Sequence, residues 1–469
     1  MDRPLTRREL AVRAAAGGAA LALPGWALIG EAGAARSPAL KQLARHVKGP
    51  VLTPRTSAGL VFNSRYAGIR PMAVVRAAGP ADVQACVRWA ARHGVRITAR
   101  SGGHSYAGYS TAQGGLVVDL RRLDSVSLSG GRVTAGAGTQ LIELYAALAR
   151  RGATVPGGSC PTVALGGLAL GGGMGLAGRR FGLTCDNVTA VQIVTADGRL
   201  HHADHDTIPD LFWACRGGGG GNFGIVTGFQ MRAHRVSSAA WFQIVWPWSQ
   251  ASEALAAWQQ LAPGAPRALT ALFTLAGNRR VSSIGQFFGG ERALRRLLRP
   301  LTRVSGAQLS TGTSGYLALM QRWAGCAGES VAQCDRFLPA PFDAGSDYVA
   351  QPLPPRGRAA AIAAAERGGT LLFDPYGGVI NRVQPSATAF VHRRQLFCIQ
   401  YYSPTASQSW VGGARRAMAP YTSGQCYQNY IDPQLEHWQR AYYGDNLDRL
   451  KAIKRAVDPD DVFRFKQGI

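Results

Sequence analysis

Apolar residues follow two different periods in the first half of the chain. In segment 80–93 they recur every three or four positions and lie on one face, which predicts an amphipathic helix. Gly94 comes directly after this segment, as glycine often does where a helix ends. A second helix is expected at 140–151. Short apolar runs predict strands at 71–78, 97–100, 116–120, 133–135 and 188–195. Strands and helices joined by glycine-rich turns indicate an α+β fold.

The pattern changes near residue 236, where glycine clusters become rare. Two amphipathic segments and three apolar runs follow. They predict helices at 250–261 and 289–301 and strands at 240–246, 269–275 and 394–402. We therefore divide the chain into a first domain at 40–235, a second domain at 236–415 and a C-terminal segment at 416–469. The last segment carries an aromatic cluster and ends on a short predicted helix at 446–457.

The N-terminus has the pattern of an export signal. Thr6-Arg7-Arg8-Glu9-Leu10 precedes an apolar stretch at 11–29, and Ala32-Gly33-Ala34 offers a small-residue cleavage site. We interpret residues 1–34 as a twin-arginine-type signal peptide, with a basic N-terminal helix as the alternative. The stretch contains Pro24, so no stable membrane span is expected. The twin-arginine machinery would export the folded protein to the periplasm or the outside of a bacterial cell.

Charge and cysteine content refine this picture. The 52 Lys and Arg residues exceed the 27 Asp and Glu residues, which gives a formal net charge of +25. The basic residues are scattered and form no nucleic-acid-binding motif, so nucleic acid is not an expected partner. Export would permit disulfides among the eight cysteines. Cys326 and Cys334 bracket a short polar loop and are the best candidates for a disulfide, with two unpaired thiols as the alternative.

Two glycine-rich segments carry the candidate chemistry. The first, Arg100 to Ser110, follows a predicted strand, and its paired glycines let successive N–H groups approach an anion such as a pyrophosphate. His104 lies at the tip of this turn, without a second histidine at metal-ligand spacing, so no metal is expected. The second segment, Pro156 to Gly175, is suited to lie flat against a large planar or anionic ligand. Cys160 precedes a proline in this loop, where a reactive thiol can be presented.

The chain resembles the berberine-bridge-enzyme-like oxidoreductases of the vanillyl-alcohol-oxidase flavoprotein superfamily. The matching segments run in family order. They are Arg100 to Ser110, Gly157 to Gly175, Gly182 to Val188, Asp210 to Thr227, Asn429 to Asp432 and Tyr442 to Phe465. The resemblance implies a split PCMH-type FAD-binding domain, to which the C-terminal segment returns. It also implies an inserted α/β substrate domain, with an antiparallel sheet that is covered by helices and walls the substrate.

The resemblance further implies that FAD is attached twice, because His104 stands where the family bonds the flavin 8α-methyl group and Cys160 where it bonds C6. The expected cofactor-binding residues are Arg100, Ser101, Gly102, Gly103, His104, Ser105, Gly157, Cys160, Thr162, Val163, Gly166, Gly167, Gly171, Gly173, Gly175, Asn222, Gly224, Val226, Tyr443 and Asn446. Val163 stands at a position associated with oxygen access and resembles the oxidase members. Leu168 departs from the histidine usual in plant members, which affects how charge on the reduced flavin is stabilised.

Substrate oxidation in this family transfers a hydride to flavin N5 and needs a base for the hydroxyl proton. The family places its catalytic tyrosine within residues 427–432, so Tyr427 and Tyr430 are both candidates. Tyrosine has a pKa near 10 and needs a cation or hydrogen bonds to act as a base at neutral pH. Gln400 stands where an alkaloid-cyclising plant member uses glutamate as its base, and glutamine cannot take a proton. Asp374 to Gly378 is a candidate substrate-side loop, with a plain turn as the alternative.

These features together predict an exported, FAD-dependent oxidase that acts on an alcohol or hemiacetal carbon. A mono- or oligosaccharide, or a glycosylated secondary metabolite, is the expected substrate, and dioxygen is the expected electron acceptor, which gives hydrogen peroxide. One alternative is a flavin-dependent dehydrogenase that uses another acceptor. Another is a flavin-containing binding protein without turnover.

Overall fold

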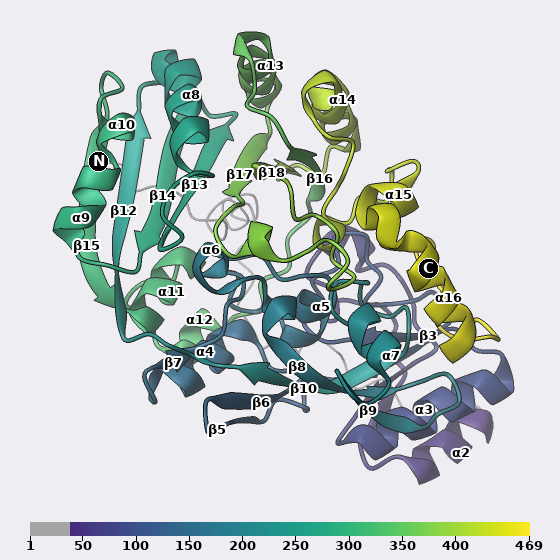
Figure 1. Cartoon of the computed structure of the whole chain (residues 1–469). Coiled ribbons are helices and arrows are strands. Elements are labelled where there is room, and N and C mark those ends of the chain that lie inside the picture. Colours follow the sequence, from purple (N-terminus) through teal and green to yellow (C-terminus); the bar gives the residue numbers. More distant parts are fainter. Residues whose placement is uncertain (1–37) are drawn as a thin grey trace.

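The computed structural model describes residues 38–469, so the predicted signal peptide at 1–34 lies outside the described residues. Two layers are visible in Figure 1: a large helix-covered sheet, and below it two smaller sheets with their own helices. None of the helices in residues 38–469 combines the length and apolarity that a membrane crossing needs. The mixture of helices and sheets is the predicted α+β class.

The first of the two smaller sheets has four strands in the order β1-β2-β4-β3. Its strands are β1 (Val51–Leu52), β2 (Ala73–Arg76), β3 (Ile97–Arg100) and β4 (Leu116–Asp119). Strands β2 and β3 both run parallel to β4, which requires a crossover connection between them. The crossover from β2 is α3 (Pro80–His93), which packs against α2 (Pro38–His46). Strand β3 therefore ends at the same sheet edge as β4, where the turn that begins at Ser101 emerges.

The second small sheet has five antiparallel strands in the order β5-β6-β10-β8-β9. Its strands are β5 (Val126–Ser129), β6 (Arg132–Gly136), β8 (Val188–Val194), β9 (Leu200–Asp204) and β10 (Ile225–Arg232), and a separate pair is formed by β7 (Ala153–Thr154) and β11 (His234–Arg235). The associated helices are α4 (Leu141–Ala149), α5 (Leu165–Leu170), α6 (Gly178–Phe181) and α7 (Pro209–Ala214). Apolar residues of both small sheets and of α3, α4 and α7 share one core.

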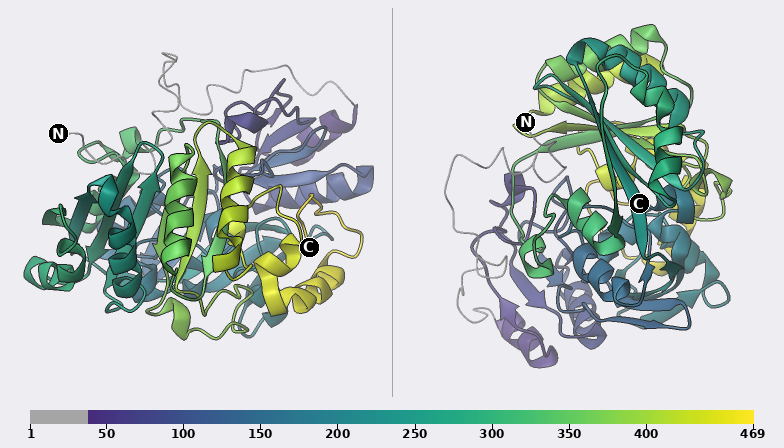
Figure 2. Two further views of the ribbon diagram at one scale, coloured as in Figure 1. Left: turned by 90° about the horizontal axis from the view of Figure 1, so that it is seen from above. Right: turned by 90° about the vertical axis from the view of Figure 1, so that its left-hand side faces the viewer.

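The large sheet has seven antiparallel strands in the order β15-β12-β14-β13-β17-β18-β16. They are β12 (Ser238–Trp246), β13 (Leu269–Ala276), β14 (Arg280–Phe287), β15 (Gln308–Gly315), β16 (Asp343–Val349), β17 (Thr370–Pro375) and β18 (Phe397–Ser403). One face is covered by α8 (Ala251–Leu261), α9 (Glu291–Leu297), α10 (Arg299–Thr302), α13 (Pro355–Glu366) and α14 (Gln408–Met418) (Figure 2). Trp258, Phe273 and Phe373 are fully buried between these helices and the sheet.

Two helices and the C-terminal segment join the layers. Helices α11 (Tyr316–Ala324) and α12 (Val331–Cys334) leave the large sheet and pack against α4. Helices α15 (Trp438–Tyr443) and α16 (Leu447–Val457) follow the large sheet, and α16 packs on α7 of the first domain. Lys454 Nζ donates to the carbonyl of Asn222, which ties α16 to the glycine run. The remaining helical turns are 3-10 helices: η1 (Ser64–Tyr66), η2 (Thr184–Asn187), η3 (Trp248–Gln250), η4 (Ile380–Arg382), η5 (Ala419–Tyr421), η6 (Gln428–Tyr430) and η7 (Gly444–Asn446).

Several local predictions can be compared with these elements. The helix at 80–93 is confirmed, and Gly94 ends it with a φ of +62°, in the left-handed region that favours glycine. The single helix expected at 289–301 is wrong, because the chain forms α9 and α10; Pro300 has no N–H to continue the hydrogen bonds of α9. A disulfide links Cys326 and Cys334, as predicted. The proposed domain boundary at residue 415 lies inside α14, a helix that covers the large sheet.

Candidate active site

A large pocket lies between the large sheet and the loops of the first domain. Its wall on the first-domain side is formed by the turn 101–106, the loop 158–164 and the glycine run 219–222. The facing wall is formed by Leu372, Gln400 and Tyr402 from β17 and β18 and by residues 427–431 around η6. The C-terminal segment also borders the pocket and lies against the first domain, where the ring of Phe465 is 5.0 Å from that of Tyr109. Its lining residues are Tyr443, Phe463, Arg464, Phe465 and Gln467. Segments that are distant in the sequence therefore build one site.

The turn after β3 is shaped to approach an anion. Gly103 has a φ of +74°, and a Cβ built there would lie 2.1 Å from the carbonyl oxygen of Leu60. A Cβ on Gly102 would lie 2.6 Å from the backbone nitrogen of Ala164. The backbone N–H groups of residues 102–105 donate to no acceptor within residues 38–469. Consecutive N–H groups of this kind form a concave anion-binding surface, which suits a pyrophosphate.

His104 stands in this turn with its ring held on several sides. Its Nε2 lies 2.9 Å from Thr162 Oγ1, Phe62 stacks on its face at 4.2 Å, and Phe337 meets it edge-on at 5.9 Å. The residue is half-buried because it borders the pocket, although it lies deep in the protein. Burial, and then the positive charge of Arg100, lower the pKa of His104 to about 3, while hydrogen bonding to the Thr162 backbone opposes this. The imidazole is therefore neutral at physiological pH, as a histidine that acts as a nucleophile must be.

Cys160 borders the same pocket from the loop between β7 and α5. It is half-buried and takes no part in a disulfide. The loop is fixed where it passes over the start of α4, because the carbonyls of Pro161 and Val163 accept the backbone N–H groups of Ile142 and Leu141. Tyr402 of β18 borders the same pocket, and burial, then the charge of Cys160, raise the pKa of Tyr402. The structure therefore brings both predicted attachment residues to one pocket.

The pocket wall also contains bare backbone and unsatisfied polar atoms. A Cβ on Gly167 would meet nothing within 4 Å, and one on Gly220 would barely touch its neighbours. Both glycines line the pocket, so a side chain at either position would project into it. Gln400 Oε1 and Gln428 Oε1 are buried at the wall without a hydrogen-bond partner among the described residues. Buried polar atoms of this kind are normally satisfied, so the wall is suited to a large ligand that has its own donors. These residues fit a flavin dinucleotide.

The substrate-side wall is organised around Tyr430. Its hydroxyl donates to Asp374 Oδ2 at 3.0 Å, and Asp374 is only 2% exposed. The ring of Tyr430 is parallel to that of Tyr106, at an interplanar angle of 4° and a centroid distance of 5.7 Å. The amide nitrogen of Gln400 donates to the hydroxyl of Tyr106 at 2.8 Å, which leaves its oxygen as the acceptor noted above. A phenol that donates to a carboxylate can pass its proton on when it takes another.

Tyr427 is held differently, although it lies three residues away. Its hydroxyl oxygen accepts the backbone N–H groups of Gly173 at 2.8 Å and Met174 at 3.2 Å, and the Asn429 side-chain amide at 3.0 Å. Burial raises the pKa of Tyr427 above its usual value, and these three hydrogen bonds oppose the shift. The hydroxyl therefore fastens η6 to the glycine-rich segment, and within residues 38–469 it has no carboxylate to receive its proton.

Most predicted site residues border the pocket. These are Ser101, Gly102, Gly103, His104, Ser105, Cys160, Thr162, Val163, Gly166, Gly167, Asn222, Gly224, Val226, Gln400, Tyr427, Tyr430 and Tyr443. Leu168 also borders it. Six others lie behind the wall: Arg100, Gly157, Gly171, Gly173, Gly175 and Asn446.

The structure gives these six residues contacts of their own behind the wall, and their role in binding flavin stays a prediction. Arg100 pairs with Asp119 at 3.1 Å, and the Asn446 side-chain amide donates to backbone carbonyls of the loop at 385–389. The four glycines allow close internal packing; a Cβ on Gly175, for example, would lie 1.7 Å from the carbonyl oxygen of Gly157. From these positions the six residues support the pocket wall.

Sequence reasoning missed several residues of the site. Tyr106 lies in the same turn as His104, so its motif could have identified it. Phe62 and Phe337 reach His104 from segments without a motif, and no local pattern indicates such contacts. Among residues 38–469, no group of three or more His, Cys, Asp or Glu residues could hold a metal ion.

Comparisons with known proteins agree with this geometry. Residues 71–204 match the model of the FAD binding domain family, and residues 426–469 match that of the berberine and berberine-like family. The FAD-linked oxidoreductase YgaK of Bacillus subtilis (strain 168) is 33% identical over 83% of this chain and 88% of its own length. The chitooligosaccharide oxidase of Gibberella zeae is 30% identical over 88% of this chain and 89% of its own length.

A solved structure extends the agreement to the whole fold. The structure of Physcomitrella patens BBE-like 1 superimposes with a TM-score of 0.88 at 32% identity, and the match covers 92% of this chain and 99% of that one. The fold and the pocket define an FAD-dependent oxidoreductase. The chain belongs to the berberine-bridge-enzyme-like family of the vanillyl-alcohol-oxidase flavoproteins, and it is related to carbohydrate oxidases.

Proposed function

We propose that this protein is an oxidase that holds FAD through both His104 and Cys160 and oxidises an alcohol or hemiacetal carbon of a carbohydrate. The observation that carries the proposal is the hydrogen bond from Tyr430 to the buried carboxylate of Asp374, in the pocket that His104 and Cys160 also border. The relationship to a chitooligosaccharide oxidase supports a mono- or oligosaccharide, or a glycosylated metabolite, as the substrate class. When bound, FAD supplies the hydride acceptor and returns the electrons to dioxygen, which gives hydrogen peroxide.

The protein's own task is to remove the hydroxyl proton of the substrate. Tyr430 takes this proton on its hydroxyl oxygen while its own proton passes to Asp374 Oδ2, 3.0 Å away. Both groups are buried, so the transfer is shielded from bulk water. Gln400 orients the substrate, because its unpaired Oε1 can accept a hydrogen bond from a sugar hydroxyl while its amide nitrogen remains bound to Tyr106. Each role uses an atom that the surrounding residues already hold in place.

Two matched variants test the assignment of the base. Tyr430→Phe should slow anaerobic flavin reduction by an oxidised sugar by about 10²- to 10⁴-fold, the usual contribution of a general base. Tyr427→Phe leaves two backbone N–H groups without their acceptor, so it should lower stability by about 1–3 kcal/mol and leave the reduction rate within about tenfold. A panel of mono- and oligosaccharides identifies the substrate. Equal losses of rate in both variants would contradict the assignment.

Oxygen use and flavin attachment are tested separately. Under air, an oxidase releases one hydrogen peroxide per sugar oxidised, whereas the flavin of a dehydrogenase stays reduced until another acceptor is added. Val163 at the pocket favours the oxidase.

The denatured protein should keep its flavin and exceed the mass of the chain by one FAD. Cys160→Ala should retain the flavin through His104, and replacement of both residues should release it. We also propose export through the segment 1–34, which a signal-peptide fusion to a reporter would test.

A further inference from the structure

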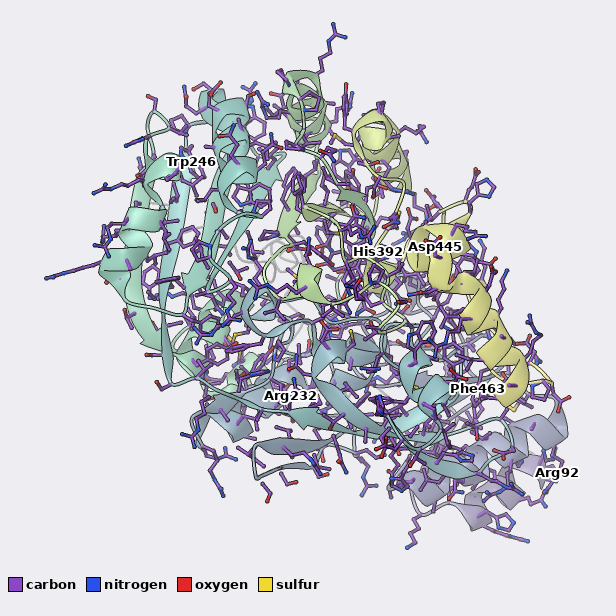
Figure 3. All side chains as sticks on the ribbon, viewed as in Figure 1. Arg92, Arg232, Trp246, His392, Asp445 and Phe463 are labelled. Atoms are coloured by element: carbon purple, nitrogen blue, oxygen red, sulfur yellow. A yellow bond between two sulfur atoms is a disulfide. The ribbon has the colours of Figure 1, made fainter. Side chains whose placement is uncertain are left out.

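The hydrogen bond between His104 and Thr162 engages only one of the two ring nitrogens of the histidine. Nε2 lies 2.9 Å from Thr162 Oγ1, whereas Nδ1 takes part in no hydrogen bond with the residues of 38–469. His392, which is labelled in Figure 3, shows the contrast. Its Nδ1 lies 3.0 Å from Gln425 Oε1, and its Nε2 lies 3.0 Å from the Tyr442 carbonyl. A histidine with both nitrogens engaged is held for structure, while His104 keeps one nitrogen uncommitted at the edge of a pocket.

Thr162 is itself held rigidly. Its backbone carbonyl accepts the side-chain amide of Gln140 at 3.2 Å, and the carbonyls on either side of it, from Pro161 and Val163, accept backbone N–H groups of α4. The residue is only 2% exposed. Stacking of Phe62 on the imidazole restricts rotation of the ring. The hydroxyl therefore meets the ring at one nitrogen and in one geometry.

This contact selects a tautomer. In a neutral imidazole one nitrogen carries the proton and the other has the lone pair, and the hydrogen bond to one decides the state of the other. The Thr162 hydroxyl oxygen can accept the proton of Nε2 at the observed 2.9 Å. In the tautomer held by this hydrogen bond the proton is on Nε2, and the lone pair is on Nδ1, which has no hydrogen-bond partner among residues 38–469.

We infer that Thr162 is the positioning residue for attachment of FAD at His104: it holds the proton on Nε2 so that the lone pair of Nδ1 can attack the 8α carbon. The inference rests on the proposed attachment. The Nδ1–C bond forms and one 8α C–H bond breaks; the two electrons pass to the flavin, and the Nε2 proton leaves as the new imidazole becomes neutral again. Dioxygen then takes the two electrons and two protons and becomes hydrogen peroxide.

The test uses the Cys160→Ala background, where His104 is the sole attachment residue. We would purify the full chain free of flavin with Thr162, with Thr162→Val and with Thr162→Ser in this background. Each would be denatured, and the covalent flavin measured by mass spectrometry over time after addition of FAD. Thr162→Val keeps the shape but removes the hydroxyl, so attachment should slow by about tenfold or more, as for loss of one hydrogen bond that holds the reactive state. Thr162→Ser restores the hydroxyl and should restore attachment.

A second readout separates positioning from a structural defect. With Cys160 present, Thr162→Val should still bind FAD, and peptide mapping should find the adduct on the Cys160 peptide and little on the His104 peptide. Attachment to His104 at the unaltered rate in Thr162→Val would overturn the inference and leave the proposed function standing. Release of all flavin from Cys160→Ala alone would overturn the attachment at His104, and the inference with it.

Discussion

Replacement of Asp374 with asparagine would separate two roles of this carboxylate: accepting a hydrogen bond and accepting a proton. An asparagine oxygen can still receive the Tyr430 hydroxyl at the observed 3.0 Å, but the amide is uncharged and cannot take the proton. A full unit of positive charge 3.0 Å from the carboxylate would be stabilised by about 5.5 kcal/mol at an effective dielectric constant of about 20, which is the upper limit of what the Asp374 charge contributes as the proton moves toward it. The transition state carries only part of this charge, and the retained hydrogen bond recovers part of the lost energy. We therefore expect a loss of about 3–4 kcal/mol, or about 10²- to 10³-fold in the rate of flavin reduction.

The measurement is stopped-flow flavin bleaching without oxygen, at saturating sugar, with the flavin content of each preparation fixed by mass spectrometry. Because the substitution preserves shape, the sugar concentration for half-maximal rate should change by less than about threefold, which would indicate that binding is intact. A reduction rate within about fivefold of the unaltered protein would refute the reasoning, since it would mean that the proton does not leave through Asp374.

Three further predictions concern the fold and the cofactor. Burial, and then the charge of Glu143, raise the pKa of Asp335 to about 7. The folded protein therefore holds this proton more tightly than the unfolded chain, so the free energy of unfolding should fall as pH rises from about 4 to 7. Asp335→Asn should remove this fall and raise the free energy of unfolding by about 1–2 kcal/mol at pH 8, measured by urea denaturation. Arg393 is fully buried and binds Asp186 through two hydrogen bonds, so Arg393→Met should cost about 3–5 kcal/mol, most of it regained when Asp186→Leu is added. Gly167→Leu should fill the pocket and abolish FAD incorporation with little change in the unfolding midpoint of the FAD-free protein.

Sequence patterns predicted correctly those elements whose determining residues all lie in one contiguous stretch of chain. The helix at 80–93 has its apolar period and its terminal glycine in one stretch of chain, and its bounds match α3. The turn with His104 and the loop with Cys160 were found for the same reason, because each motif is contiguous. The disulfide was also local, with a sequence separation of 8.

Contacts between segments that are distant in the sequence could not be predicted from local patterns. Asp374 and Tyr430 are 56 positions apart, and they meet because the end of β17 faces η6. Sequence reasoning marked the segment 374–378 only as a substrate-side loop, and it left Tyr427 and Tyr430 equal. What separates the two tyrosines is the partner of each hydroxyl, and these partners come from other elements. The ion pair of Arg100 is another contact of this kind, since its partner Asp119 lies on the neighbouring strand β4.

The alternation of side chains along β18 has a consequence for how the protein can change. Phe397, Ile399 and Tyr401 pack beneath the covering helices, while Gln400 and Tyr402 border the pocket. Neighbouring positions in one strand therefore have different physical constraints: one set packs the core and the other shapes the pocket. Substitutions at 400 and 402 can alter the accepted substrate without a large cavity cost in the helix-covered core. This strand is the place to begin a library for altered specificity.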